Sequence, residues 1–146
     1  QGIEPIFSNC YIADFAKAKV TKKNEELKKV LQRHGKDTEE VWASIIKQDG
    51  SVQHLDFLTE HEKSVFLTFY EIPPEEIIDQ AADRQEFIDQ SQSLNLAINS
   101  SWTPKEINAL MYRAWEKGVC SLYYQHGVNA SKQLASGRSE CVACEA

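Results

Sequence analysis

The chain of 146 residues has the length of one ordinary domain, with 42% hydrophobic and 26% charged residues. A formal net charge of −6 argues against a binder of nucleic-acid phosphates, because such proteins need a basic face. No apolar run approaches the ~20 residues of a membrane span, and no signal peptide opens the chain. We therefore expect a soluble protein, and its four unevenly spaced cysteines favour the reducing cytoplasm over a secreted disulfide framework.

The N-terminal segment is expected to enter as extended chain and to continue into a helix. Residues 3–15 mix apolar and β-forming side chains, and the locally basic segment 17–29 is interpreted as a solvated helix face. Asn24 is a favourable N-cap and Gly35 a favourable helix end, so one helix is predicted between them. Its apolar stripe consists of Leu27, Val30 and Leu31.

Three further helices are predicted in the middle of the chain. Thr38 begins the first of them, which the turn signal at residues 49–50 ends. Thr59 and Glu62 form a capping box for the second, in which hydroxyl and carboxylate each satisfy an orphan amide. Pro74 suits the first position of the third. The residues expected to face inward are Val41, Trp42, Ile45, Ile46, Val65, Phe66, Phe69, Ile77, Ile78, Ala81 and Ala82.

The last third of the chain carries a strand signal followed by a well-marked helix. Apolar side chains alternate along residues 94–98, which predicts a strand. Thr103 and Glu106 form a second capping box around Pro104, and Gly118 closes the helix that follows. Its apolar positions are Ile107, Leu110, Met111, Ala114 and Trp115.

Residues 118–125 favour a half-buried pleated backbone and are predicted to form a short strand. Its adjacent Tyr123 and Tyr124 would ordinarily be packing residues with a polar tip. The alternative is a redox role, because a phenol with a pKa of ~10 must release its proton when it loses an electron. Consecutive side chains of a regular strand point to opposite faces, so a relay between these rings predicts irregular backbone that brings both to one side.

Residues 126–146 contain little to bury and are predicted to form a flexible tail. Its most specific signal is the pair Cys141 and Cys144. A zinc site lacks a second ligand pair, and a thioredoxin-like site would need the cysteines at the start of a helix. A mobile tail can instead carry a dithiol between a buried disulfide and an external reductant, and a chance pair also stays open.

Other polar residues do not complete an active site. Gln90, Gln92 and Asn95 are interpreted as a hydrogen-bonded scaffold or, alternatively, as the lining of a site. His54 is more typical of a satisfied structural histidine than of a base, and the histidines lack metal-ligand spacing. There is no phosphate loop and no nucleophile elbow. Two predicted strands do not make a free-standing parallel sheet, so we expect part of a larger α/β structure.

Several sequence motifs together resemble the C-terminal portion of the large (catalytic) subunit of class I ribonucleoside-diphosphate reductase. The motifs are Gly2-Ile3-Glu4-Pro5, Ser8-Asn9, Ser51-Val52-Gln53-His54-Leu55, Ala81-Ala82-Asp83-Arg84-Gln85, Phe87-Ile88-Asp89-Gln90-Ser91-Gln92-Ser93-Leu94-Asn95, Ala114-Trp115-Glu116-Lys117-Gly118-Val119 and Ser121-Leu122-Tyr123-Tyr124. The resemblance runs nearly end to end, and the terminal cysteine pair strengthens it.

The resemblance implies an α/β fold, namely the C-terminal part of a ten-stranded α/β barrel over residues 1–125, made mainly of helices with a few strands. Residues 126–146 would be the flexible tail with its redox dithiol. Tyr124 would accept a radical from the small subunit and Tyr123 would pass it toward a cysteine that becomes a thiyl radical. Cys141 and Cys144 would re-reduce the active-site disulfide that forms when a ribonucleoside diphosphate becomes a deoxyribonucleoside diphosphate.

The same resemblance implies the partners and cofactors. This part of the subunit would bind no cofactor itself, since the tyrosyl radical and dimetal centre lie on the small subunit. Thioredoxin or glutaredoxin would be the reductant, and a separate N-terminal piece of the large subunit would complete the site for the ribonucleoside diphosphate. Neither nucleic acid nor membrane is an expected partner.

The chain also departs from the family. The thiyl cysteine, the reducing pair and the catalytic Glu and Asn lie upstream in the family, and Cys10 and Cys120 stand in the wrong contexts to replace them. We therefore expect one piece of a split or dissected enzyme that is active only with partner chains. An inactive remnant and a stand-alone dithiol-shuttle or binding module remain the alternatives.

Overall fold

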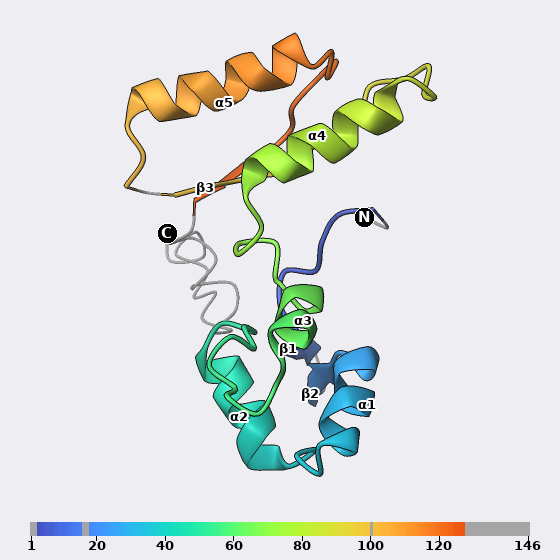
Figure 1. Cartoon of the computed structure of the whole chain (residues 1–146), viewed down its shortest axis with the longest axis vertical. Helices are drawn as coiled ribbons and strands as arrows, with labels where there is room; N and C mark the ends of the chain where they lie inside the picture. The colour runs from blue at the N-terminus through green and yellow to red at the C-terminus, as the bar shows by residue number, and fades with distance from the viewer. Residues whose placement is uncertain (1–2, 16–17, 100, 128–146) are drawn as a thin grey trace, which may run out of the picture. The chain divides into compact units, whose positions relative to one another are not determined.

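The computed structural model describes residues 3–15, 18–99 and 101–127 (Figure 1). They form two compact units, one within residues 3–69 and the other within residues 70–127. Cys141, Cys144 and the rest of segment 128–146 lie outside the described residues. Within the described part of the chain, no helix has the length and apolar character needed to cross a membrane.

The first unit begins with a β-hairpin. Strand β1 (Cys10–Phe15) pairs antiparallel with β2 (Ala18–Lys23), in a register that places Cys10 opposite Lys23. The extended chain expected at the start is thus confirmed from Cys10 onward, but the helix-face interpretation of segment 17–29 is wrong for β2. Val20 and Thr21 are β-branched, and pairing with β1 satisfies the backbone hydrogen bonds of β2 while Lys19 and Lys22 remain exposed.

Two helices pack the core of this unit. Helix α1 (Glu25–Arg33) is capped by Asn24, whose Oδ1 accepts the N–H groups of Glu26 and Leu27 at 3.0 and 3.4 Å. Helix α2 (Glu39–Lys47) is capped by Thr38, as predicted. The buried residues of this core are Cys10, Leu27, Val30, Leu31, Trp42, Ile45, Val52, Leu55, Leu58 and Phe66.

A buried asparagine connects four segments of the first unit. Asn9 is 1% exposed, and its Nδ2 donates to the carbonyls of Gly50 at 3.0 Å and Phe66 at 2.7 Å. Its Oδ1 accepts from Nδ2 of Asn24 at 2.9 Å, at the cap of α1. Gly50 has a φ of +87° in the predicted turn, and a Cβ there would lie 1.9 Å from Oγ of Ser8. The start of the hairpin, the α1 cap, the turn and the end of α3 are therefore joined by one amide.

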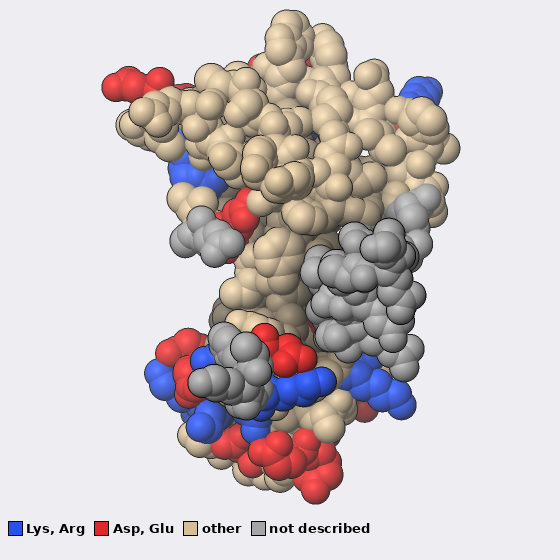
Figure 2. All heavy atoms as spheres, turned by 180° about the vertical axis from the view of Figure 1, so that it is seen from behind, with Lys and Arg blue, Asp and Glu red and all other residues tan. Residues whose placement is uncertain are grey.

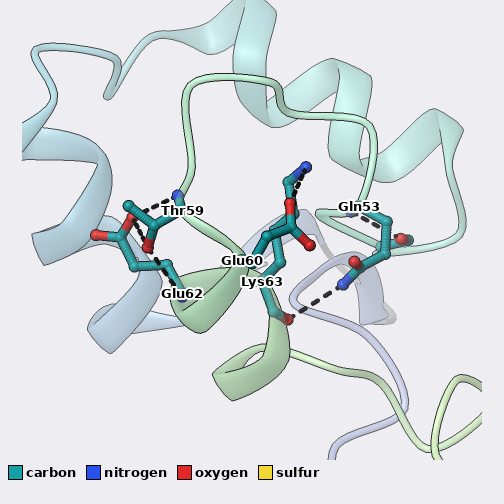
Figure 3. Close-up of polar contacts among 6 residues, drawn as sticks. Gln53, Thr59, Glu60, Glu62 and Lys63 are labelled. Atoms are coloured by element: carbon teal, nitrogen blue, oxygen red, sulfur yellow. Dashed lines mark hydrogen bonds and ion pairs between the residues drawn. The ribbon is translucent and has the colours of Figure 1, made fainter.

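Helix α3 (Glu60–Val65) is shorter than its apolar pattern predicted. The capping box is confirmed: Oγ1 of Thr59 accepts the N–H of Glu62 at 3.2 Å, and Oε2 of Glu62 accepts the N–H of Thr59 at 2.9 Å (Figure 3). Figure 3 also shows Nε2 of Gln53 donating to the carbonyl of Lys63 at 3.1 Å. The prediction that Val65 faces inward is wrong, because it is 61% exposed; the chain leaves the helix there to bury Phe66.

Charged side chains of both signs are interspersed on the face of the first unit shown in Figure 2. Nζ of Lys23 lies 2.7 Å from Oε1 of Glu39, and Nζ of Lys29 lies 2.6 Å from Oε1 of Glu26. Lys23 of the hairpin is thus paired with an acid on α2, Lys29 is paired within α1, and the basic residues do not gather into one basic patch on this face.

The second unit contains two helices and a pair of parallel strands. Helix α4 (Pro74–Gln85) begins at the predicted proline, and α5 (Pro104–Glu116) begins at the predicted capping box and ends before Gly118, whose φ is +77°. Strand β3 (Leu96–Ile98) pairs parallel with β4 (Gln125–Gly127). The buried residues of this core are Ile77, Ile78, Ala81, Leu94, Leu96, Ile98, Leu110, Ala114 and Val119.

Three expectations for this unit differ from the structure. The prediction that Trp115 faces inward is wrong: it is 70% exposed, because the buried stripe of α5 is narrower and follows Leu110 and Ala114. The strand expected at residues 118–125 begins only at Gln125, since the preceding residues connect the end of α5 to the sheet. His126 and Gly127 belong to β4, so regular structure continues two residues beyond the expected start of the tail.

Candidate functional site

Tyr123 and Tyr124 lie side by side just before β4. Their ring centroids are 4.1 Å apart, their planes are inclined by 60°, and the Tyr123 hydroxyl donates to the Tyr124 hydroxyl with an O–O distance of 3.3 Å. This separation is slightly below the ~4.5–7 Å usual for aromatic pairs. Both residues are more than half exposed. The prediction that irregular backbone brings both phenols to one side is confirmed.

The irregularity lies in the hydrogen bonds between the two neighbouring segments. In a regular parallel ladder, one residue makes two bonds to the neighbouring strand. Its N–H donates to the residue before its partner, and its C=O accepts from the residue after its partner. Here the C=O of Leu94 accepts from Tyr123, at 2.8 Å, whereas the N–H of Leu96 donates to Tyr124, at 2.9 Å. Tyr123 and Tyr124 therefore each make one of the two bonds that a single residue opposite Asn95 would make in a regular ladder. The tyrosine segment therefore contains one extra residue, in the manner of a β-bulge.

The bulge takes the Tyr124 N–H out of the ladder, and the side chain of Asn95 supplies a new acceptor for it. Its Oδ1 accepts the backbone N–H of Tyr124 at 3.1 Å. Asn95 lies between the two residues that bond to the tyrosines, Leu94 and Leu96, and the regular register resumes with Leu96 opposite Gln125. The sequence had offered scaffold and site-lining interpretations for this amide, and the structure places it in backbone contact with the tyrosine pair.

The contact between the hydroxyls also affects their ionisation. The hydrogen bond to Tyr124 is the main reason that the pKa of Tyr123 is raised above its ordinary value of ~10, because ionisation would remove the donated proton. The proximity of Tyr124 and partial desolvation act in the same direction. Tyr123 therefore holds its proton throughout the neutral range, with that proton directed at the neighbouring phenol oxygen.

Two further residues extend this arrangement. The ring of His126 on β4 lies 5.9 Å from the ring of Tyr124, at an interplanar angle of 54°. Sequence reasoning had not assigned His126 to the site, although its position two residues after Tyr124 was the available signal. On the other side, the Ser121 hydroxyl donates to the carbonyl of Gln92 at 3.1 Å.

Gln92 is part of the scaffold beneath this segment. Its Nε2 donates to the carbonyl of Ala81 at 2.7 Å and to Oε1 of Gln85 at 3.0 Å, and its Oε1 accepts from Nε of Arg84 at 3.1 Å. These bonds hold the segment between α4 and β3 against the end of α4. The structure therefore favours the scaffold interpretation for Gln92.

The comparison with protein families identifies this fold. The family model described as "Ribonucleotide reductase, barrel domain" matches residues 1–125. The chain belongs to the ribonucleotide reductase barrel-domain family. The helix-rich architecture with few strands fits part of an α/β barrel, as predicted.

Relatives in this reductase family cover most of the chain. The ribonucleoside-diphosphate reductase large subunit of Invertebrate iridescent virus 6 is 40% identical over 126 residues, which are 84% of this chain and 13% of the relative. The ribonucleoside-diphosphate reductase subunit alpha of Chlamydia trachomatis serovar D is 31% identical over 131 residues, which are 90% of this chain and 12% of the relative.

A solved structure shows the same fold. The class Id ribonucleotide reductase alpha subunit of Actinobacillus ureae is 44% identical and superposes with a TM-score of 0.77, over 92% of this chain and 24% of that one. The chain thus spans less than a quarter of each of these three reductase proteins.

The cysteines of this reductase chain differ in environment. Cys10 is 2% exposed in the first core, and burial raises the pKa of its thiol above its usual value. Cys120 is exposed, and its Sγ lies 3.9 Å from the carbonyl oxygen of Gly118. The predicted dithiol of Cys141 and Cys144 lies outside the described residues.

His54 behaves as a structural group. Nε2 of His54 lies 2.9 Å from Oγ of Ser44, and burial lowers the pKa of His54, in keeping with the structural interpretation. Among residues 3–15, 18–99 and 101–127, no cluster of three or more His, Cys, Asp or Glu side chains is arranged to hold a metal ion.

Proposed function

We propose that this chain forms part of the large subunit of a ribonucleoside-diphosphate reductase and carries its radical-transfer tyrosine pair. Membership of the reductase family supports the enzyme class. The observation that carries the residue assignment is the direct contact of the phenol oxygens of Tyr123 and Tyr124, at 3.3 Å.

The geometry suits transfer of a hydrogen atom between the phenols. A Tyr124 phenoxyl, formed by oxidation from the small subunit, takes the hydrogen atom that Tyr123 directs at it. Tyr124 then regains its O–H bond and Tyr123 becomes the phenoxyl, so one electron and one proton move together. The O–O distance of 3.3 Å is slightly longer than the ~2.6–3.2 Å over which such proton transfers occur, so only a small approach of the two phenols is needed. Tyr123 next oxidises a cysteine in the remainder of the large subunit, and the thiyl radical activates the ribose.

The tail dithiol would complete the cycle. Reduction of the ribose 2′-carbon releases water and oxidises two active-site thiols to a disulfide. Cys141 and Cys144 exchange with that disulfide, which restores the two thiols and leaves a disulfide in the tail. Thioredoxin or glutaredoxin then reduces the tail. The dimetal centre and tyrosyl radical would reside on the small subunit, and this chain would contribute the two phenols and the two tail thiols.

The test is reconstitution of the chain with the remainder of a large subunit and a small subunit, with deoxyribonucleotide formation as the readout. We expect turnover with the unmodified chain and a loss of at least about a hundredfold in Tyr123→Phe and in Tyr124→Phe. Phenylalanine retains ring area and removes the oxidisable O–H group. Tyr11→Phe, a partly exposed tyrosine on β1 of the first unit, is the matched control and should retain turnover.

Two outcomes would contradict the proposal. Substantial turnover in either tyrosine variant would return the pair to a packing role. An assembled complex of the unmodified chain that binds its partners but forms no product would favour the inactive remnant.

A further inference from the structure

The contact between Tyr123 and Tyr124 depends on a conformation that the strand itself does not favour. The extra residue displaces the Tyr123–Tyr124 peptide from the ladder between Leu94 and Leu96. Outside the ladder, the Tyr124 N–H loses its strand hydrogen bond, and at this exposed position only water or a side chain can replace it, so regular pairing competes with the bulge. Regular pairing would direct the two rings to opposite faces and separate the phenols.

We propose that Asn95 is a positioning residue for radical transfer, whose side-chain oxygen holds the backbone bulge that keeps the Tyr123 and Tyr124 phenols in contact. The inference rests on the proposed radical role of the pair and adds a residue to it. Asn95 Oδ1 accepts the N–H of Tyr124, the donor that the bulge removes from the ladder. The amide thereby stabilises the irregular register over the regular one. It acts through its bond to the Tyr124 backbone.

The side chain suits this task because of its length and its place. Asn95 lies between Leu94 and Leu96, whose backbone groups bond to the tyrosines. Its short side-chain amide therefore reaches the N–H of Tyr124 on the opposite segment. An asparagine side chain imitates a backbone carbonyl at this reach, as it does in turns. A longer or apolar side chain would leave the Tyr124 N–H without this acceptor.

The chain contains a closely matched control. Asn99, just after β3, accepts the backbone N–H of Ser101 through its Oδ1 at 3.0 Å. It is the same residue type and its Oδ1 also accepts a backbone N–H, but its bonds are made to Ser101, two residues away. Asn95→Ala and Asn99→Ala therefore both remove an amide acceptor beside β3, and only Asn95→Ala removes one that bonds to the tyrosine segment.

The experiment uses the full chain assembled with the remainder of a large subunit and a small subunit. Residue-resolved hydrogen exchange measures the Tyr124 amide, a crystal structure of each variant measures the phenol contact, and steady-state kinetics measure turnover. In Asn95→Ala we expect the Tyr124 amide to exchange several-fold faster, the phenol oxygens to lie beyond hydrogen-bond distance, and kcat to fall about tenfold or more. The KM for the ribonucleoside diphosphate should stay unchanged, since Asn95 acts on the relay alone.

Rescue distinguishes positioning from general damage to the fold. Asn95→Asp retains an acceptor oxygen at the same reach, so it should restore protection of the Tyr124 amide and most of the turnover. Asn99→Ala should match the unmodified protein in all three measurements. An Asn95→Ala complex with the phenols in contact and unaltered kcat would overturn the inference, as would failure of Asn95→Asp to restore the contact.

A measurement on the unmodified complex decides the matter even if Asn95→Ala does not fold. A Tyr124 amide that exchanges as fast as an unprotected loop amide would overturn the inference, whereas protection supports it. The test of Asn95 and the test of the proposed radical role can fail independently of each other. Separated phenols with unchanged turnover in Asn95→Ala would support positioning and refute the radical role. Loss of turnover in Tyr123→Phe and Tyr124→Phe, with contact and turnover intact in Asn95→Ala, would support the radical role and refute positioning by Asn95.

Discussion

Arg113 on α5 contacts Asp79 on α4 through two hydrogen bonds, Nη2 to Oδ2 at 2.7 Å and Nε to Oδ1 at 3.3 Å. Lys117 adds a longer ion pair to the same carboxylate, at 3.5 Å. The hydrogen bond from Arg113 is the main reason that the pKa of Asp79 lies below its ordinary value. This two-point pairing fixes how the two helices of the second unit lie against each other.

We expect Arg113→Met to lower the midpoint of thermal unfolding of the second unit by a few degrees at pH 7, because Asp79 loses its two-point partner. The folded pKa of Asp79 is depressed, so its contribution is present above the unfolded pKa of ~3.9 and is lost as the pH falls through the folded value. The difference between variant and unmodified chain should therefore shrink in acid. Calorimetry between pH 7 and pH 3 measures it. Lys117→Met is the control, and an equal loss in both variants would refute the specific role of Arg113.

Glu62 should govern the acid stability of the first unit. The N–H of Thr59, followed by the hydrogen bond with His34, lowers the pKa of the Glu62 carboxyl to about 2. The ionised form therefore stabilises the fold fully above the unfolded pKa of ~4.3, and that contribution disappears as the pH falls toward about 2. Glu62→Gln should be less stable than the unmodified chain at pH 7, and the gap should close between pH 5 and pH 2.

Urea unfolding at a series of pH values measures this effect. Glu60→Gln is the control, because Glu60 lies on the same helical turn and makes an exposed pair with Lys63, at 3.3 Å. A pH-independent gap for Glu62→Gln would show that the amide disturbs the cap by its geometry and not by its charge.

The tail cysteines should matter only when the reductant is a protein. We expect Cys141→Ser or Cys144→Ser in the assembled reductase to abolish turnover with thioredoxin, since the shuttle needs both thiols. A small dithiol that enters the active site directly should partly restore turnover. Cys120→Ser, which changes an exposed cysteine outside this pair, is the control and should retain activity with both reductants. Equal losses with protein and small-molecule reductants would contradict the shuttle role.

The outer face of α5 presents two aromatic side chains to solvent. Tyr112 is 57% exposed and Trp115 70% exposed, with ring centroids 5.3 Å apart. The proposed assembly with a small subunit needs a docking surface, and we expect this exposed aromatic pair to contribute to it. Trp115→Ser should weaken binding of the small subunit about tenfold or more, which calorimetric titration measures.

Phe87→Ser provides the comparison for Trp115→Ser. Phe87 is 85% exposed and lies in the same unit but outside α5, so its replacement removes a similar apolar surface elsewhere. Unchanged affinity in Trp115→Ser, or equal weakening in both variants, would refute a specific docking role for α5.

Local signals in the sequence predicted the helices well. Asn24, Thr38, Thr59 and Thr103 each cap the helix that was predicted to follow them, because a cap depends only on groups within one turn. The hairpin of β1 and β2 was missed because its pairing joins residues that carry mixed apolar and basic side chains and show no clean alternation. Trp115 was misplaced because helical periodicity gives the position on a helix but not the width of the buried stripe.

The site could be predicted in part. The family resemblance directed attention to Tyr123 and Tyr124, and the argument that consecutive strand residues diverge predicted the irregular backbone. Asn95 was noticed only as one of several amides, since its bond to Tyr124 spans 29 residues and arises from the register of two segments. Register is a property of the assembled pair of strands, so neither segment carries it alone.

The buried amide of Asn9 has a consequence for how the first unit opens. Its bonds join residues separated by 15, 41 and 57 positions in the chain; the two longer-range bonds are buried in the folded state, and the bond to Asn24 is partly buried. Detaching any one segment would leave a buried donor or acceptor unsatisfied in the others. The hairpin start, the α1 cap, the turn at Gly50 and the end of α3 therefore unfold as a single cooperative block. Fraying of one end of this unit cannot proceed without loosening all four.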